Sequence, residues 1–458
     1  MPRFLALVCS LLVCGLSAEA RYFCGSRDTA DLTSVRYVSP GGKDGEACGA
    51  ALAAPCATIA AGIASCKGAG CAVLVAFGEY PQADTLVLAD GISLYGGCEE
   101  REQPNARRVS LIRGARYKVA VLARQIAAPT VFHSFAVIAG PGQPKAQGAT
   151  VSSIAFESIG STGLVLRAVS LTGGAGGDGY DGLGNGATGE RGNPAREGNR
   201  QNAGRSPHGV ADGGEGGARG HSGFTGAPGS SGVAAAGGAP LGGNGEDGRT
   251  GRGGSGGLAP ANRNGSIDFR FEWTPQEARF AMDGGYGGGG GGGAGSEFRD
   301  GGAGGAGGGG GTGGPPGQQG GASIGLLIAG GRLVVEESSI RGGVGGAGSA
   351  AGRGGFGGAG GAGAKANGPT GGRGGSGGMG GPGGGGAGSH GGPAFTVATA
   401  GTSDEDGLFL PASVQLYLGT GGQPGKAGEA RAGGSPGEPA LPGLASLGLR
   451  LEFRGGAQ

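Results

Sequence analysis

Cysteine is the residue type in this chain whose number and spacing most directly predict chemistry. Of the eight cysteines, Cys9 and Cys14 lie in the first twenty residues, and the other six lie before residue 100. These six are Cys24, Cys48, Cys56, Cys66, Cys71 and Cys98. An even number confined to one end of a chain favours a cap stapled by three disulfides, with the connectivity left open. The short spacer between Cys66 and Cys71 makes that pair a mild preference.

Metal binding is the alternative chemistry for these cysteines. Zinc sites use Cys-x-x-Cys pairs and nearby histidines, and the sequence has neither arrangement. A stretch at 176–184 (GGDGYDGLG) fits the calcium nonapeptide of β-roll proteins, and 242–247 (GGNGED) is a partial match. Calcium binding of that kind needs tandem copies on adjacent turns, and these two are far apart. We therefore predict no metal and no cofactor.

Candidate catalytic side chains are sparse. A glycosidase needs two carboxylates about 5–10 Å apart, whereas Glu336 and Glu337 would point to opposite faces of a strand. No Ser-His-Asp grouping can be argued. The chain is predicted not to be an enzyme, and if it is one, the candidates are His133, Arg167 and Glu336.

The N-terminus predicts export. Arg3, an apolar run over 4–16 and the small residues of Ala18-Glu19-Ala20 form a secretory signal with cleavage after Ala20. No later stretch is long and apolar enough to span a membrane. A formal net charge of +1 supplies no basic face for nucleic acid or an anionic membrane. We predict a secreted or cell-surface protein without a nucleic-acid partner.

Short segments rich in β-branched residues are the elements that would position these side chains. Strands are predicted at 35–38, 73–77, 85–88, 92–95 and 109–112, with a helix over 57–65 whose inner face carries Thr58, Ile59 and Ile63. Short strands in quick succession, without Asn-Gly or Asp-Gly hairpin turns, favour a wound coil of parallel strands.

An internal repeat supports the coil. Residues 153–156 (SIAF) and 164–174 (LVLRAVSLTGG) correspond to 323–326 (SIGL) and 333–343 (LVVEESSIRGG). Repeats that bury little alone must stack to share a core. The alignment places Arg167 level with Glu336, which predicts a surface ion pair worth under about 1 kcal/mol.

Three stretches resemble a known family: 37–45 (YVSPGGKDG), 54–59 (APCATI) and 88–97 (LADGISLYGG). They look like exported right-handed parallel β-helix proteins with a pectate-lyase-like fold, over about residues 36–115. The resemblance implies an all-β, right-handed parallel β-helix whose open end is covered by a short N-terminal capping helix near Thr58 and Ile59. Lyases of this fold use clustered aspartates and a basic residue, and no such cluster is present here.

Glycine accounts for 123 of 458 residues and is concentrated in two tracts, at 173–321 and 342–392. Interruptions in the three-residue frame exclude a collagen triple helix. The tracts are either disordered, flexible loops or polyglycine-II-like slabs of packed extended helices. An island in the first tract, with alternating Ile267, Phe269, Phe271 and Trp273 followed by Thr274-Pro275-Gln276-Glu277, predicts one strand and then a capped helix. It would plug the core or, less favoured, expose an aromatic ligand platform.

These observations predict the following organisation: signal peptide 1–20; disulfide-rich cap and first coils 21–115; coils 116–172; glycine-rich insertion 173–322 with the island at 266–283; coil 323–341; second insertion 342–393; terminal strands 394–458.

The predicted function is a non-enzymatic structural or adhesive surface protein that contacts a surface glycan or another cell-envelope component. A polysaccharide lyase or hydrolase, and an ice-binding protein, are the alternatives.

Overall fold

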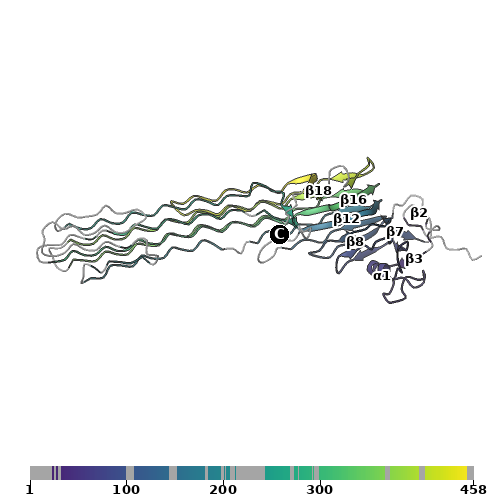
Figure 1. Cartoon of the computed structure of the whole chain (residues 1–458), viewed down its shortest axis with the longest axis horizontal. Helices are drawn as coiled ribbons and strands as arrows, with labels where there is room; N and C mark the ends of the chain where they lie inside the picture. Colours follow the sequence, from purple (N-terminus) through teal and green to yellow (C-terminus); the bar gives the residue numbers. More distant parts are fainter. Residues whose placement is uncertain are drawn as a thin grey trace, which may run out of the picture.

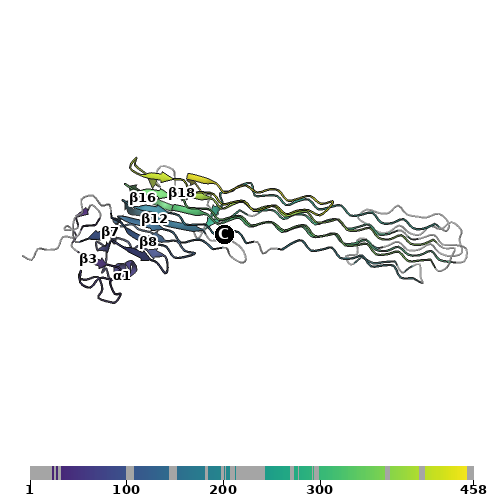
Figure 2. The same cartoon turned by 180° about the vertical axis from the view of Figure 1, so that it is seen from behind.

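The computed structural model describes a block of parallel strands from which a bundle of extended glycine-rich segments projects along the strand direction (Figures 1 and 2). The predicted signal at 1–20 lies outside the described residues. These comprise 23–24, 27–28, 32, 34–99, 108–143, 152–180, 184–197, 201, 203–206, 212, 243–268, 273–276, 278–290, 292, 299–366, 372–401 and 408–450.

The strands of the block form three rows in which neighbours are parallel. The first row consists of β3 (Val35–Val38), β4 (Ala72–Ala76), β7 (Ser93–Glu99), β10 (Thr130–His133), the second halves of β12 (Ser153–Arg167) and β16 (Ser323–Glu336), and β19 (Leu408–Phe409). The second row consists of β5 (Glu79–Pro81), β8 (Ser110–Arg113), β11 (Phe135–Ile138), β13 (Ser170–Thr172), β17 (Ser339–Arg341) and β20 (Gln415–Tyr417). The third row consists of β6 (Leu86–Val87), β9 (Val121–Arg124), the first halves of β12 and β16, β18 (Ala394–Ala400) and β21 (Ala445–Arg450).

From β4 onward the chain visits the rows in the fixed order first, second, third. The corner between the first and second rows is made by a single residue in the left-handed region on three successive passes of the chain: Ser134 (φ 59°), Ala168 (φ 51°) and Glu337 (φ 48°). One such residue redirects the chain without a hairpin, so the next strand joins another row instead of folding back. The predicted all-β class with large parallel sheets is therefore correct.

The rows enclose an apolar core. Phe132 and Phe135 come from adjacent rows and stack with ring centroids 4.4 Å apart, and Phe156 from the third row lies 5.6 Å from Phe132. All three are fully buried. The period-two alternation of each short strand sends one side chain inward and the next outward, which is why such short strands suffice to build a shared core.

One helix is described, α1 (Ile59–Ala64), and it packs beside the start of the first row (Figure 1). It is shorter than the predicted 57–65. Ile59 is fully buried, and Gly62 lies against the side chains of Val38 and Val73. Thr58 is not on the inner face as predicted. It is the exposed N-cap residue, and its hydroxyl accepts a hydrogen bond from Ala61 N, because the first turn has backbone N–H groups without helical partners.

The N-terminal strands and the island differ from the parallel pattern. β1 (Phe23–Cys24) pairs antiparallel with β7 and with β2 (Arg27–Asp28). β14 (Ser266–Ile267) and β15 (Trp273–Thr274) form an antiparallel pair. The prediction of one continuous strand from Ile267 to Trp273 is therefore wrong, because these two residues pair with each other across a hairpin. Phe269 and Phe271 lie outside the described residues.

The helix predicted after Thr274 is also wrong over the described part of the island. Residues 278–283 run extended, and their N–H groups bond to another segment: Arg279 N to Leu258 O and Met282 N to Ser255 O, both at 2.9 Å. These bonds replace the intrahelical ones. Ile267 and Trp273 are buried against Ile324, Leu327 and Phe395 on the outer side of the third row, so Trp273 is no exposed platform.

Every long glycine-rich excursion leaves from the second row and returns to the third. β13 precedes the first tract and β17 precedes the second. A third excursion, 418–444, connects β20 to β21 and falls within the range predicted as terminal strands. Because all three begin at the ends of neighbouring parallel strands of the second row, their first residues lie side by side, as the bridges from Ala175 to Val344 and from Val344 to Thr420 show.

Candidate functional site

The three candidate catalytic residues lie in one line of the first row. His133 pairs in register with Arg167, and Arg167 with Glu336, on adjacent parallel strands. Arg167 Nε donates to Glu336 Oε2 at 2.7 Å, so the predicted ion pair is present. The Arg167 side chain is 46% exposed, which keeps the pair screened by solvent. His133 is buried beside Tyr95, with ring centroids 5.9 Å apart.

The chemistry available to this line is limited. Its in-register members are Tyr37, Leu74, Tyr95, His133, Arg167 and Glu336. The guanidinium is bonded to the only carboxylate among them, so a second carboxylate for acid–base catalysis at a glycosidic bond is missing from this line. The burial of His133 further limits its access to a polymeric substrate.

The six cysteines between residues 21 and 100 form three disulfides: Cys24–Cys98, Cys48–Cys56 and Cys66–Cys71. The mild preference for Cys66–Cys71 is confirmed. Cys24–Cys98 spans 74 residues and fastens β1 to the end of β7. In the chain-entropy description, a loop of that length stabilises the fold by about 4 kcal/mol.

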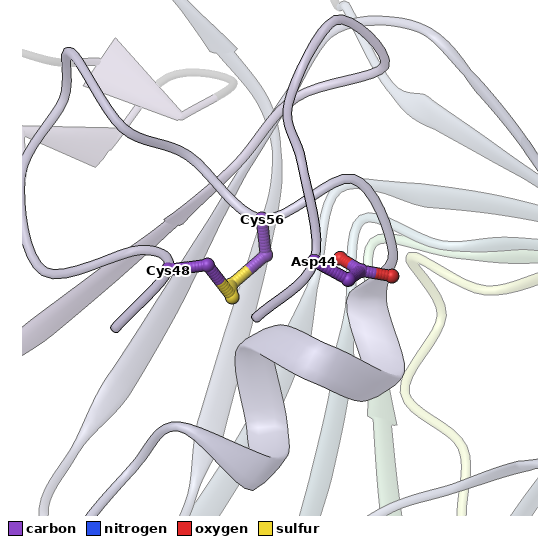
Figure 3. A group of neighbouring side chains, drawn as sticks. All are labelled: Asp44, Cys48 and Cys56. Atoms are coloured by element: carbon purple, nitrogen blue, oxygen red, sulfur yellow. A yellow bond between two sulfur atoms is a disulfide. The ribbon is translucent and has the colours of Figure 1, made fainter. Parts of the chain in front are cut away.

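Asp44, Cys48 and Cys56 are the one group in the described residues whose ligand atoms gather as a metal site would require (Figure 3). Both sulfurs are consumed by the Cys48–Cys56 disulfide. Asp44 Oδ1 accepts hydrogen bonds from the N–H groups of Ala57 at 2.7 Å and Thr58 at 3.0 Å, and Oδ2 accepts from the Thr58 hydroxyl at 2.9 Å. The donor set does not fit a metal, and the carboxylate instead secures the start of α1.

The electrostatics of Asp44 follow from these bonds. Partial burial raises the pKa of Asp44, but the hydrogen bonds from Thr58 and Ala57 together outweigh burial and hold that pKa below its ordinary value. At Asp84, the Lys118 ammonium and the Thr85 N–H lower the pKa of the carboxyl. Neither carboxylate has the raised pKa of a general acid.

The glycine-rich segments form an ordered bundle through backbone hydrogen bonds that recur every third residue. Gly302, Gly305, Gly308, Gly311 and Gly314 donate to the carbonyls of Gly372, Gly375, Gly378, Gly381 and Gly384, each at 2.8–3.0 Å. A three-residue period is that of polyproline II and related helices. The described parts of the tracts therefore follow the ordered alternative, not the disordered one.

Segment 372–392 lies at the centre of the bundle. Its backbone exchanges hydrogen bonds with six neighbouring segments: 243–258, 278–290, 299–321, 343–366, 420–431 and 434–443. Three residues per turn, each with one donor and one acceptor, supply six bonding directions, and all six are used.

This packing explains why the centre is glycine. A Cβ on Gly380 would lie 1.9 Å from Gly309 O, and a Cβ on Gly378 would lie 2.1 Å from Arg249 O. Neighbouring backbones occupy the positions that side chains would need, so each residue facing a neighbour must lack one. Side chains are accommodated only where the bundle is open.

Where one side of a bundle segment faces solvent instead of another segment, every third residue carries a side chain that points outward. Along segment 343–366 the outward residues are Val344, Ala347, Ala350, Arg353, Phe356, Ala359, Ala362 and Lys365. Arg353 pairs with Glu429 at 3.0 Å, and the Arg431 guanidinium lies 4.1 Å from the Phe356 ring centroid. This surface mixes charged, aromatic and small residues.

Two polar side chains that no sequence pattern singled out bond glycine-rich segments to one another and to the island, just before the chain re-enters β16 and β18. Buried His390 contacts Pro260 O through Nε2 at 2.8 Å and accepts from Leu441 N at Nδ1 at 2.9 Å. Gln319 donates to Arg263 O at 2.8 Å and accepts from Gln276 N at 3.0 Å. The sequence feature that could have identified them is a single large polar residue among glycines, near the end of a tract that leads back into a strand.

Comparison with known proteins identifies no relative: no family model, no curated protein and no solved structure matches the chain. Among the described residues, none belongs to a helix that could cross a membrane.

Proposed function

We propose that the chain is an exported, non-enzymatic structural or adhesive protein. In this proposal the three rows are the coils of a right-handed parallel β-helix, capped by α1 and the disulfides, and the scaffold presents the glycine-rich bundle to a surface glycan or another cell-envelope component. The order in which the chain visits the rows and the single-residue corners support the coil.

The bundle is the observation that carries the proposal. The central segment is stiffened by backbone bonds to neighbouring segments along its whole length, and the rim of the bundle displays side chains at regular intervals. Such an arm suits spacing and surface contact, whereas the line His133–Arg167–Glu336 lacks a pair of free acid–base groups.

Binding and turnover should be measured on the same preparation of the full mature chain. We expect the labelled chain to sediment with isolated, glycan-rich envelope material while releasing no reducing or unsaturated sugar. Reversing rim charges with Arg353→Glu and Lys426→Glu should weaken sedimentation, with Arg124→Glu on the block as the matched control. Equal sedimentation of all variants, or none by the wild type, would contradict the adhesive role of the bundle.

A polysaccharide lyase or hydrolase is the second candidate, favoured by the in-register placement of His133, Arg167 and Glu336. If sugar is released from a polysaccharide panel, each of His133→Ala, Arg167→Ala and Glu336→Gln should abolish it. Release that survives all three substitutions would exclude this line as the active site. The mixed composition of the rim line at 344–365 gives no support to ice binding.

A further inference from the structure

The N–H groups of every third residue in the central segment form a line that points toward one edge of the bundle, and their acceptors show how that edge is satisfied. Gly385, Gly388 and Gly391 donate their N–H groups to the carbonyls of Ser435, Glu438 and Leu441 in segment 434–443, at 3.0, 3.0 and 3.2 Å. Toward the far end of the bundle that neighbouring segment is no longer beside the line. The same line continues there with Pro382, which has no N–H, and then with residues that carry side chains.

Beyond Pro382, side chains take over as acceptors. Ser376 N donates to Asp247 Oδ1 at 2.6 Å, and Arg373 N donates to Asn244 Oδ1 at 2.8 Å. The side-chain oxygens thus occupy the role that backbone carbonyls of segment 434–443 have nearer the block. Asn244 and Asp247 are three residues apart, which matches the period of the donor line.

Two other edges are closed in the same way. Ala347 N donates to Asp178 Oδ1 at 2.7 Å, and Arg353 N to Asn185 Oδ1 at 2.9 Å. On a third edge, Gly313 N donates to Asp283 Oδ1 at 2.7 Å. Asp178 and the Asn244–Asp247 pair lie in the two stretches that resemble calcium nonapeptides, so these motifs have a different structural use here.

We propose that these Asn and Asp side chains stop the bundle from adding further glycine-rich segments at its edges. The lines of N–H donors that they cover are docking sites for the glycine-rich bundle of a second copy of this chain once the side-chain oxygens are removed. A line of N–H groups at a regular spacing is the counterpart of an unpaired strand edge, which recruits further chains unless it is blocked. A second copy is the occupant because the line that contains Arg373 and Ser376 already bonds to a glycine-rich segment nearer the block, where Gly385, Gly388 and Gly391 donate to segment 434–443.

The test removes the caps on one edge. We expect Asn244→Gly with Asp247→Gly to raise the mass measured by light scattering toward twice that of the wild type as concentration increases. Glycine is used because a Cβ on this line meets the backbone of residues 433–436 where that neighbouring segment is present, at 1.8 Å for Gly253 and 1.9 Å for Gly256. In the same variant at low concentration, the amides of Arg373 and Ser376 should exchange about tenfold faster, since each loses its side-chain acceptor.

The matched control keeps an acceptor oxygen at each position: Asn244→Asp with Asp247→Asn should leave mass and exchange at wild-type values. Two results would overturn the proposal. One is faster exchange of Arg373 and Ser376 in the glycine variant without any change of mass. The other is an equal rise in mass in the glycine and control variants, which would assign association to a general loss of structure.

Discussion

At the scale of single residues, side-chain oxygens that satisfy backbone N–H groups are the recurrent device of this protein. Asp44 serves the first turn of α1, and Asp178, Asn244 and Asp247 serve the edges of the glycine bundle. In each case a short polar side chain accepts the hydrogen bond of a backbone N–H group that has no backbone carbonyl beside it. Buried N–H groups are costly without partners, so these residues act on stability and on specificity.

The lowered pKa of Asp44 predicts a pH dependence with a definite sign. Its carboxyl has a lower pKa in the folded chain than the ordinary 3.8 expected on unfolding. Its contribution is therefore fully present above that ordinary value and is lost as the pH falls through the folded value. We expect Asp44→Ala to reduce the free energy of unfolding by about 1 kcal/mol at neutral pH, a modest figure because the carboxylate is exposed.

Denaturant unfolding of the wild type and Asp44→Ala at neutral pH and near pH 2.5 measures this effect. The difference between them should shrink at the acid pH, because protonation removes the charge of the wild-type carboxylate and leaves the alanine variant unchanged. Asp44→Asn, which keeps one acceptor oxygen, is the control and should show a pH-independent difference from Asp44→Ala. A wild-type advantage that is the same at both pH values would disprove the role given to the carboxylate.

At the scale of elements, strands and bundle segments both pack against neighbours, but the residues that face a given neighbour recur with different periods. Strands hide every second side chain in the core, whereas each bundle segment presents every third residue to a given neighbour. A segment at the rim can place side chains on the side that faces solvent, whereas 14 of the 21 residues of the central segment 372–392 are glycine. The glycine content of a segment thus follows the number of its neighbours.

Gly380 and Met379 provide a matched test within that segment. A Cβ at Gly380 would lie 1.9 Å from Gly309 O, while the Met379 side chain is 56% exposed. We expect Gly380→Ala to destabilise the bundle by at least about 1–3 kcal/mol through overpacking, and Met379→Ala to change it by under about 0.5 kcal/mol. The measurement is native-state amide exchange over 302–314 and 372–386. Equal effects of the two substitutions would show that backbone contact does not set the need for glycine.

At the scale of the whole molecule, the block and the bundle are continuous along the strand direction (Figures 1 and 2). All three excursions leave from one corner, so the pairing of strands within each row aligns the tracts before they pack. Gln319 then bonds one returning tract to the island through Gln276, and His390 bonds another to Pro260 and Leu441 of two neighbouring segments. The rows therefore determine the order of the bundle, and the bundle covers the third row through Ile267 and Trp273.

This continuity predicts that the central tracts are protected in solution. We expect amides of 302–320 and 374–392 to exchange as slowly as those of β16 in hydrogen-exchange mass spectrometry of the full chain, because each is bonded to a neighbouring segment. Amides of rim segment 184–195 should exchange faster. Complete exchange of the central tracts within the first time point would contradict the bundle.

Much of the local structure was accessible from the sequence. The cysteine count predicted a stapled cap, the repeat predicted the Arg167–Glu336 pair, and the short β-branched segments predicted parallel strands. These features depend on residue type and spacing along the chain, which a sequence displays directly. The signal at 1–20 stays a prediction.

Only the tertiary structure decided the pairing of Cys24 with Cys98, the hairpin at Ile267 and Trp273, and the order of the glycine tracts. Each depends on segments that are distant in sequence. A glycine tract has the same composition whether it is free or packed among other segments, because its packing depends on which backbones the rows of strands bring beside it. Local propensity predicted a helix after Thr274, and bonds to a segment about twenty residues earlier replaced it.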